Sequence, residues 1–193
     1  MKKRRMTGLL LALPIAFLSL PAFAEEMPLG HMDGVNWYTS EQEMRIIEGL
    51  PEEELAEGTI VGDYLRYGFL HYEDIPYASY TIYMYRNDLL VLYGTSADAF
   101  LQADEILMKN VFHEYLQSLG AVYGIPGMTD ERRVINVFNA IEPDALSMED
   151  VVAFAGWDVD EDTTLLLVQL ENEYVDAVYT LYVNEARLFA DGE

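Results

Sequence analysis

Apolar residues recur along the chain with two different periods, which predict separate helices and strands. Spacings of three and four residues predict helices at 40–49, 98–119, 130–141 and 147–156. Runs rich in tyrosine and β-branched residues predict strands at 59–70, 78–86, 89–93, 163–170 and 174–183. We therefore expect an α+β fold in which helices pack on an antiparallel β-sheet.

Several predicted elements begin or end at residues that are typical of helix caps and turns. Ser40 and Glu43 form a capping box, in which each side chain accepts a hydrogen bond from a backbone N–H at the start of the first helix. Ser96 is expected to cap the long second helix and Gly120 to end it. Residues 86–88 are expected to form a hairpin turn between two strands.

Two parts of the chain resemble each other in the order and spacing of their residues. The parallel segments are Ser40-x-x-Glu43-Met44-x-x-Ile47-x-Gly49 with Ser147-x-x-Asp150-Val151-x-x-Phe154-x-Gly156, and Ala78-x-Tyr80-Thr81-Ile82-Tyr83 with Ala177-x-Tyr179-Thr180-Leu181-Tyr182. One interpretation is a tandem repeat, with related halves at 35–95 and 145–185 linked by the helices at 98–119 and 130–141. The other is that short capped helices and Tyr-Thr strands are common and recur here by chance.

The first of these segments resembles a known signature. Residues Ser40, Glu43, Met44, Gly49 and Pro51 match the Ser/Thr-x-x-Glu/Gln-Val…Gly-x-Pro helix that opens small lipoproteins of the SmpA/OmlA type. The same helix-then-sheet unit, duplicated, is the architecture of β-lactamase inhibitory protein. The resemblance implies a scaffold for protein contacts, and it carries no catalytic residues to this chain.

The chain as a whole also resembles uncharacterised secreted proteins of Gram-positive bacteria. These proteins share a Trp-x-x-Ser-x-x-Glu start and a Tyr-Gly-x-Pro connector, which here are Trp37, Ser40, Glu43 and the segment 123–126. This second resemblance implies export and does not suggest a reaction.

The first 24 residues have the pattern of a secretory signal peptide. Basic residues 2–5 precede an apolar run at 9–20, and Ala22-Phe23-Ala24 is a small-x-small cleavage site. We expect cleavage after Ala24 and a single domain at 25–193, exported to the periplasm or the medium. The chain has no Cys, which excludes lipid attachment, disulfides and thiol chemistry, and no other stretch is apolar enough to span a membrane.

The charge balance limits the partners that the protein can bind. The chain has 11 Lys and Arg against 34 Asp and Glu, and four of the basic residues lie in the predicted signal peptide. The resulting negative field repels phosphate backbones and anionic lipids, so we expect no nucleic-acid or membrane-surface binding. A hydrophobic content of 51% is too high for a disordered acidic chain.

One helix begins like a zinc-protease motif but does not complete it. His113 is followed by Glu114, yet Gln117 stands where His-Glu-x-x-His requires its second His. We therefore interpret His113 as a helix-surface residue. The sequence has no Gly-x-Ser-x-Gly and no Gly-rich phosphate loop, so we predict neither an enzyme nor a cofactor.

Three alternating aspartates are a weak candidate for calcium binding. Asp158, Asp160 and Asp162 begin like a calcium loop, but Thr163 and Gln169 stand where an EF-hand has Gly and Glu. Weak calcium binding and a solvated acidic loop both stay open, and the loop is the simpler interpretation.

Tyrosines are concentrated in the first predicted group of strands. Eight of the 14 lie between residues 64 and 93. Exposed aromatic residues on a sheet make good anchors for a protein or a glycan, and Tyr67, Tyr80, Tyr83 and Tyr85 are the candidates. The alternative, which we favour, is cross-strand aromatic packing beneath the long helix.

These observations lead to a functional hypothesis with two alternatives. The first is an exported, non-catalytic protein-interaction module, inhibitor-like by resemblance, whose acidic surface favours a basic partner. The second is a glycan- or cell-wall-binding module that uses the same tyrosines. The third is a hydrolase whose carboxylates the sequence does not identify.

Overall fold

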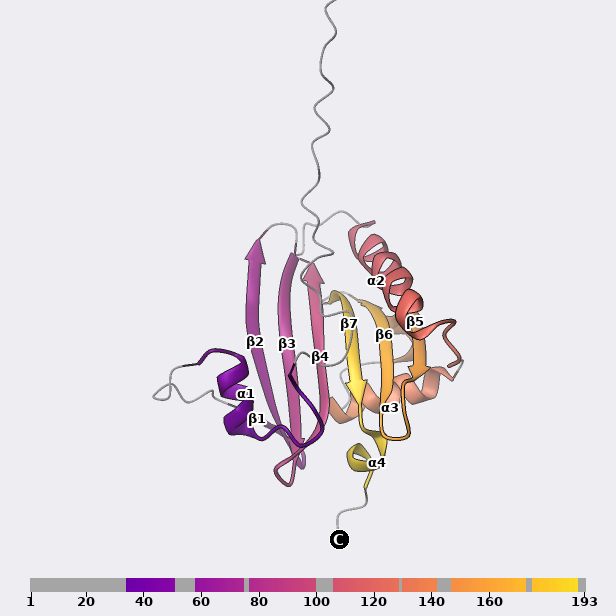
Figure 1. The fold of residues 1–193 in the computed structure, drawn as a ribbon. Coiled ribbons are helices and arrows are strands. Elements are labelled where there is room, and N and C mark those ends of the chain that lie inside the picture. The colour runs from indigo at the N-terminus through magenta and orange to yellow at the C-terminus, as the bar shows by residue number, and fades with distance from the viewer. Residues whose placement is uncertain are drawn as a thin grey trace, which may run out of the picture.

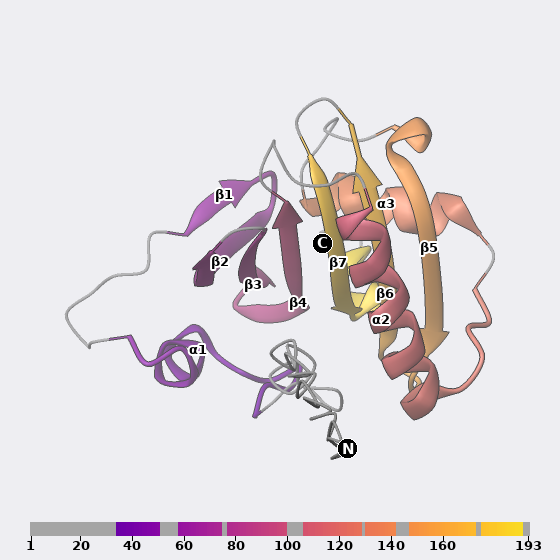
Figure 2. The same cartoon turned by 90° about the horizontal axis from the view of Figure 1, so that it is seen from above.

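The structure is a computed structural model that describes residues 34–50, 58–74, 77–99, 106–128, 130–141, 147–172 and 175–190. Within these residues seven strands form one antiparallel sheet, with helices on both faces (Figures 1 and 2). The predicted α+β class is confirmed. The predicted signal peptide lies outside the described residues, and none of the described helices is long and apolar enough to cross a membrane.

The strands are β1 (Thr59–Val61), β2 (Tyr64–Asp74), β3 (Tyr77–Arg86), β4 (Leu89–Ala99), β5 (Val151–Asp158), β6 (Thr164–Glu171) and β7 (Asp176–Val183). The helices are α1 (Glu41–Ile47), α2 (Leu107–Tyr123), α3 (Glu131–Ile141) and α4 (Glu185–Leu188), with one 3-10 turn at Met148–Asp150. The sheet order is β1-β2-β3-β4-β7-β6-β5, so β4 and β7 meet at its centre (Figure 1).

Helices cover both faces of the sheet, which we call the front face and the back face. The front face packs against α1 and α2, through Met44 of α1 and Met108 of α2. The back face packs against α3 and α4, through Val137 of α3 and Leu188 of α4. Figure 2 shows α2 in front of the β5–β7 part of the sheet and α3 behind it.

An aromatic row fills the front core. The rings of Tyr83 and Tyr93 lie 5.1 Å apart, and Tyr93 stacks on Tyr182 at 6.2 Å. The hydroxyls of Tyr182 and Tyr123 lie 3.3 Å apart, and the Tyr123 ring lies 6.5 Å from Trp157. The first two contacts are cross-strand, and Tyr123 of α2 continues the row from β7 to Trp157 of β5.

The first helix agrees with its sequence signature. Ser40 accepts from the Glu43 backbone N–H at 3.3 Å, and Glu43 accepts from the Ser40 backbone N–H at 2.8 Å. The helix is fastened to the sheet by two tyrosines, because Tyr83 donates to Glu48 at 2.6 Å and Tyr67 donates to Glu41. The capping box therefore stabilises the start of α1, and the two tyrosine hydrogen bonds hold the helix against the sheet.

Both predicted boundaries of the long helix are wrong, and the start is wrong because strand β4 is longer than its apolar run. Ser96 and Asp98, expected at the start of the long helix, lie in β4 and pair with β3 on one side and β7 on the other. The helix begins at Leu107 instead, passes through Gly120 and ends at Gly124, which has a φ of 83°. Pairing on both sides outweighs the local capping signal of Ser96.

The fourth predicted helix is also wrong. Ser147 and Asp150 form a capping box, but it closes only a three-residue 3-10 turn. The chain then enters β5, which pairs along its length with β6. The strand predicted at 59–70 is divided by a turn at Gly62, where φ is 59°.

The two Tyr-Thr segments of the suspected repeat flank the same strand. Tyr80 of β3 and Tyr179 of β7 both pair with Ser96 of β4, and the segments match on either side of β4 from residue 93 to residue 98. The similar sequences therefore occupy similar positions about the central strand. Only the first of the two Ser-x-x-acid segments opens a helix on the sheet.

Candidate functional site

Three of the four candidate tyrosines are buried in the front core. Tyr67, Tyr83 and Tyr85 are at most 4% exposed, so they are not available as contact anchors. Burial, together with a hydrogen bond to Glu41, raises the pKa of Tyr67 to about 12, and burial also raises the pKa of Tyr83 and Tyr85. These phenols stay neutral. They pack across the strands as the alternative expected, but Tyr67 and Tyr83 bond to the α1 segment and not to the long helix.

Tyr80 lies on the opposite face and is half-buried. It lines a groove on the back of the sheet with a volume of about 320 Å³. We call this cavity the Asp98 groove; its described lining consists of Thr59, Arg66, Gly68, Tyr80, Ile82, Ser96, Asp98 and Tyr179, together with Tyr67, which also belongs to the front core. Its size is at the lower end of the range for small-molecule sites, which also suits a single side chain of a partner.

Strand register explains the shape of the groove. Tyr80, Ser96 and Tyr179 form one cross-strand row, so a small residue lies between two tyrosines. In the next row Asp98 lies between Ala78 and Ala177, both buried and small. Directly opposed residues share a face of the sheet, so the carboxyl and the two phenols belong to one surface.

Asp98 is the chemically distinctive group of the groove. Its carboxyl hydrogen-bonds the Ser96 side chain, but its Oδ1 is buried and has no partner among the described residues. Burial raises the pKa of this carboxyl, and the Ser96 hydrogen bond offsets part of the effect. A buried acceptor without a donor costs free energy, so Asp98 is not explained by folding alone.

The walls of the groove are supported from outside it. Phe138 of α3 packs edge-on against Tyr179, with ring centroids 5.2 Å apart. Gly68 of β2 pairs with Ile82, and a Cβ added at Gly68 would meet nothing within 4 Å. The absence of a side chain at Gly68 therefore leaves space beside Ile82.

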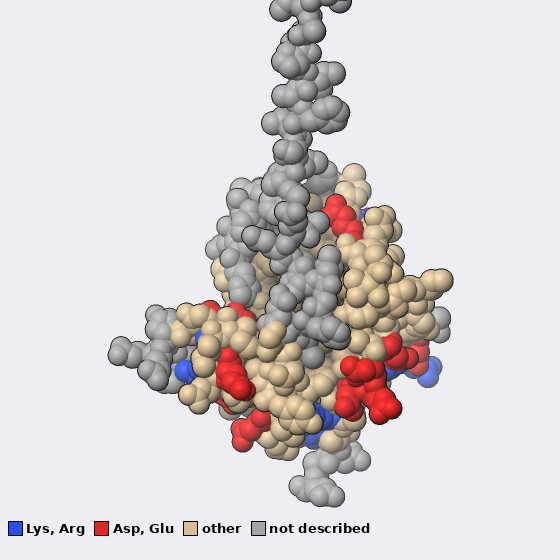
Figure 3. Space-filling model, viewed as in Figure 1, with Lys and Arg blue, Asp and Glu red and all other residues tan. Residues whose placement is uncertain are grey.

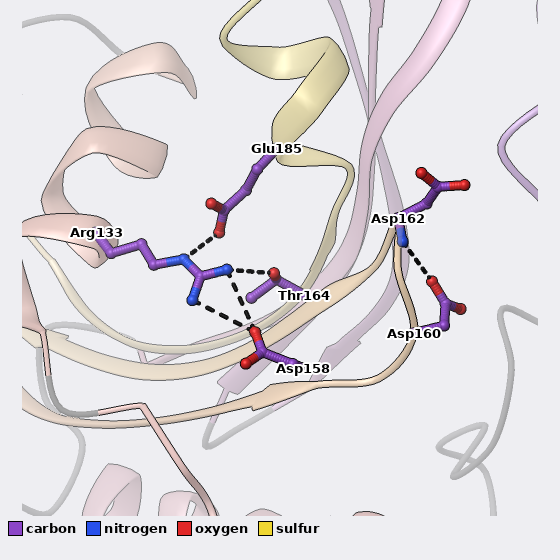
Figure 4. Close-up of polar contacts among 6 residues, drawn as sticks. All are labelled: Arg133, Asp158, Asp160, Asp162, Thr164 and Glu185. Carbon is purple, nitrogen blue, oxygen red and sulfur yellow. Dashed lines mark hydrogen bonds and ion pairs between the residues drawn. The ribbon is translucent and has the colours of Figure 1, made fainter.

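The three aspartates of the calcium hypothesis do not form a common site. Asp158 faces Arg133, whose guanidinium lies 3.4 Å away and also reaches Glu185, while Asp160 accepts a hydrogen bond from the Asp162 backbone (Figure 4). Within the described ranges, no group of three or more His, Asp or Glu is placed to hold a metal ion. Asp158 therefore forms an ion pair with Arg133. Asp160 and Asp162 are exposed, in agreement with the solvated-loop interpretation.

Acidic side chains dominate the charged surface of the front face. Figure 3 shows them gathered at the lower ends of β5 and β6 and near α1, with few Lys or Arg in view. His113 is exposed on α2, as the sequence interpretation expected. The charge distribution is consistent with attraction of cationic groups.

Sequence reasoning identified Tyr80 but missed Ser96, Asp98 and Tyr179 as site residues. The available signal was the matched tyrosine of the two Tyr-Thr segments, together with the polar residues Ser96 and Asp98 after the apolar run of β4. Polar residues two positions apart on a central strand lie on one face and indicate that apolar packing does not fill that face there.

The chain has no match among protein-family models, curated proteins or solved structures. The resemblance to SmpA/OmlA-type lipoproteins and to β-lactamase inhibitory protein therefore stays a hypothesis.

Proposed function

We propose that this protein is an exported, non-catalytic protein-interaction module, and that its contact site is the Asp98 groove. The observation that carries the proposal is the buried Oδ1 of Asp98, which has no partner among the described residues and belongs to a groove with tyrosines on both sides. A partner that supplies a donor there would satisfy an acceptor that the fold leaves without one.

The surroundings of the groove favour a protein as partner. Leu70 of β2 pairs with Tyr80, shares its face and is 49% exposed, and Ile82 is half-buried beside them. Apolar side chains next to a few polar groups are the usual composition of a protein–protein contact. The excess of acidic residues would attract a basic partner to the protein.

Capture experiments test the proposal. Immobilised protein would be exposed to envelope and culture fractions of its source at low and high salt, and bound species identified by mass spectrometry. We expect one stoichiometric protein partner, weakened by salt, with capture reduced at least tenfold by Tyr80→Ala because a groove wall is lost.

Tyr38→Ala is the matched control, since Tyr38 is 79% exposed and lies outside the groove lining. Both variants should keep the wild-type circular dichroism spectrum. Equal capture by wild type and Tyr80→Ala would contradict the groove as contact site, and recovery of wall polymer in place of a protein would replace the protein partner with a glycan.

A further inference from the structure

The groove needs a hydrogen-bond donor at one end. Asp98 Oδ1 is buried without a partner among the described residues, and an ionised carboxyl accepts most strongly from a charged donor. Ammonium and guanidinium groups carry several N–H donors and a full positive charge. A cation therefore fits this end of the groove better than a neutral hydroxyl does.

Aromatic rings on both sides add a second attraction for a cation. Tyr80 and Tyr179 flank Ser96, one row from Asp98. A cation near the face of a tyrosine is attracted by the negative charge of the ring. The protein uses this contact elsewhere, since the Arg187 guanidinium lies 5.0 Å from the centre of the Tyr38 ring and that of Arg86 lies 5.5 Å from that of Tyr64.

The described lining of the groove also contains a basic residue, Arg66. Arg66 pairs with Met84 on β3 and Asp98 pairs with Ala78, so six residues of β3, about 20 Å of strand, separate the two rows. The side chains next to the Asp98 carboxyl, those of Ser96, Ala78 and Ala177, are small.

We propose that the Asp98 groove binds a lysine or arginine side chain of the partner protein, with its cationic group on Asp98 and between Tyr80 and Tyr179. This inference rests on the proposed function and names the chemistry that the site recognises. It commits the groove to a basic protein segment, in agreement with the seven basic and 34 acidic residues that follow residue 24.

A peptide titration tests the inference. The probe is acetyl-Gly-Gly-Lys-Gly-Gly-amide, added to isotope-labelled protein while backbone amide shifts are followed by NMR. We expect saturable shifts confined to the groove strands, no such shifts with the Nε-acetylated lysine peptide, and at least tenfold weaker binding by Asp98→Asn. Asp88→Asn, which neutralises an exposed carboxylate outside the groove lining, should bind as the wild type does.

The outcomes separate the inference from the proposed function. Equal shifts with charged and acetylated peptides, or unchanged binding by Asp98→Asn, overturn the lysine and arginine assignment. Shifts with an N-acetylglucosamine oligomer but none with the lysine peptide overturn it in favour of a glycan. Partner capture that depends on Tyr80 but is not competed by the lysine peptide overturns only the cation assignment. Capture that ignores Tyr80→Ala overturns the proposed function itself.

Discussion

Gly94→Ala is expected to destabilise the protein by about 3 kcal/mol or more, because the centre of the sheet has no room for a methyl group. A Cβ at Gly94 would lie 2.4 Å from the Thr180 carbonyl oxygen and 2.6 Å from Leu181 Cδ2. The first contact is with backbone, so relief requires a shift between β4 and β7. These two strands join the halves of the sheet, and urea unfolding measures the loss.

Gly68→Ala is the matched control for this prediction. Gly68 also lies in a strand, but a Cβ there meets nothing within 4 Å, and its φ is not in the left-handed region. We expect its free energy of unfolding to stay within about 0.5 kcal/mol of wild type or to rise slightly, since alanine loses less backbone entropy on folding. Equal effects of the two substitutions would contradict the close β4–β7 contact.

Phe138→Ala is expected to cost about 3–5 kcal/mol, the range for removal of a buried phenylalanine side chain. Phe138 is 4% exposed in the back core and holds one wall of the groove through Tyr179. The substitution leaves a cavity and removes the edge-on ring contact, so a loss of groove binding should accompany the loss of stability. Chemical denaturation and peptide titration measure the two effects.

Phe189→Ala provides the comparison, because Phe189 is 45% exposed near the end of the chain. We expect a change of less than about 1 kcal/mol there and unaltered groove binding. If Phe138→Ala were no more costly than Phe189→Ala, α3 would not be packed on the back of the sheet as described.

The sequence predicted elements that short-range chemistry determines. Ser40 and Glu43 form their capping box within four residues of chain, and the turn at Asn87 and Asp88 has the positive φ angles of 49° and 62° that a tight hairpin requires. In both cases the decisive contacts lie inside the segment itself. The local sequence pattern is therefore sufficient to predict the capping box and the turn.

Elements determined by pairing were harder to predict. Ser147 and Asp150 form a capping box as good as the first, but the apolar run after them suits a strand or a helix equally. Its outcome depends on β6, which begins at residue 164. The local pattern likewise predicts a helix start at Asp98, whereas pairing with Ala78 and Ala177 holds this residue in a strand.

The free energy of unfolding of Asp98→Asn tests the central claim, that this carboxyl serves contact and not folding. Burial raises its folded-state pKa, so its contribution to stability is complete below the unfolded-state pKa and lost as the pH rises through the folded-state pKa. We predict that the variant is more stable than wild type at neutral pH by about 1 kcal/mol. The gain should shrink as the pH approaches about 4. A loss of stability at neutral pH would identify Asp98 as a structural group and contradict the account.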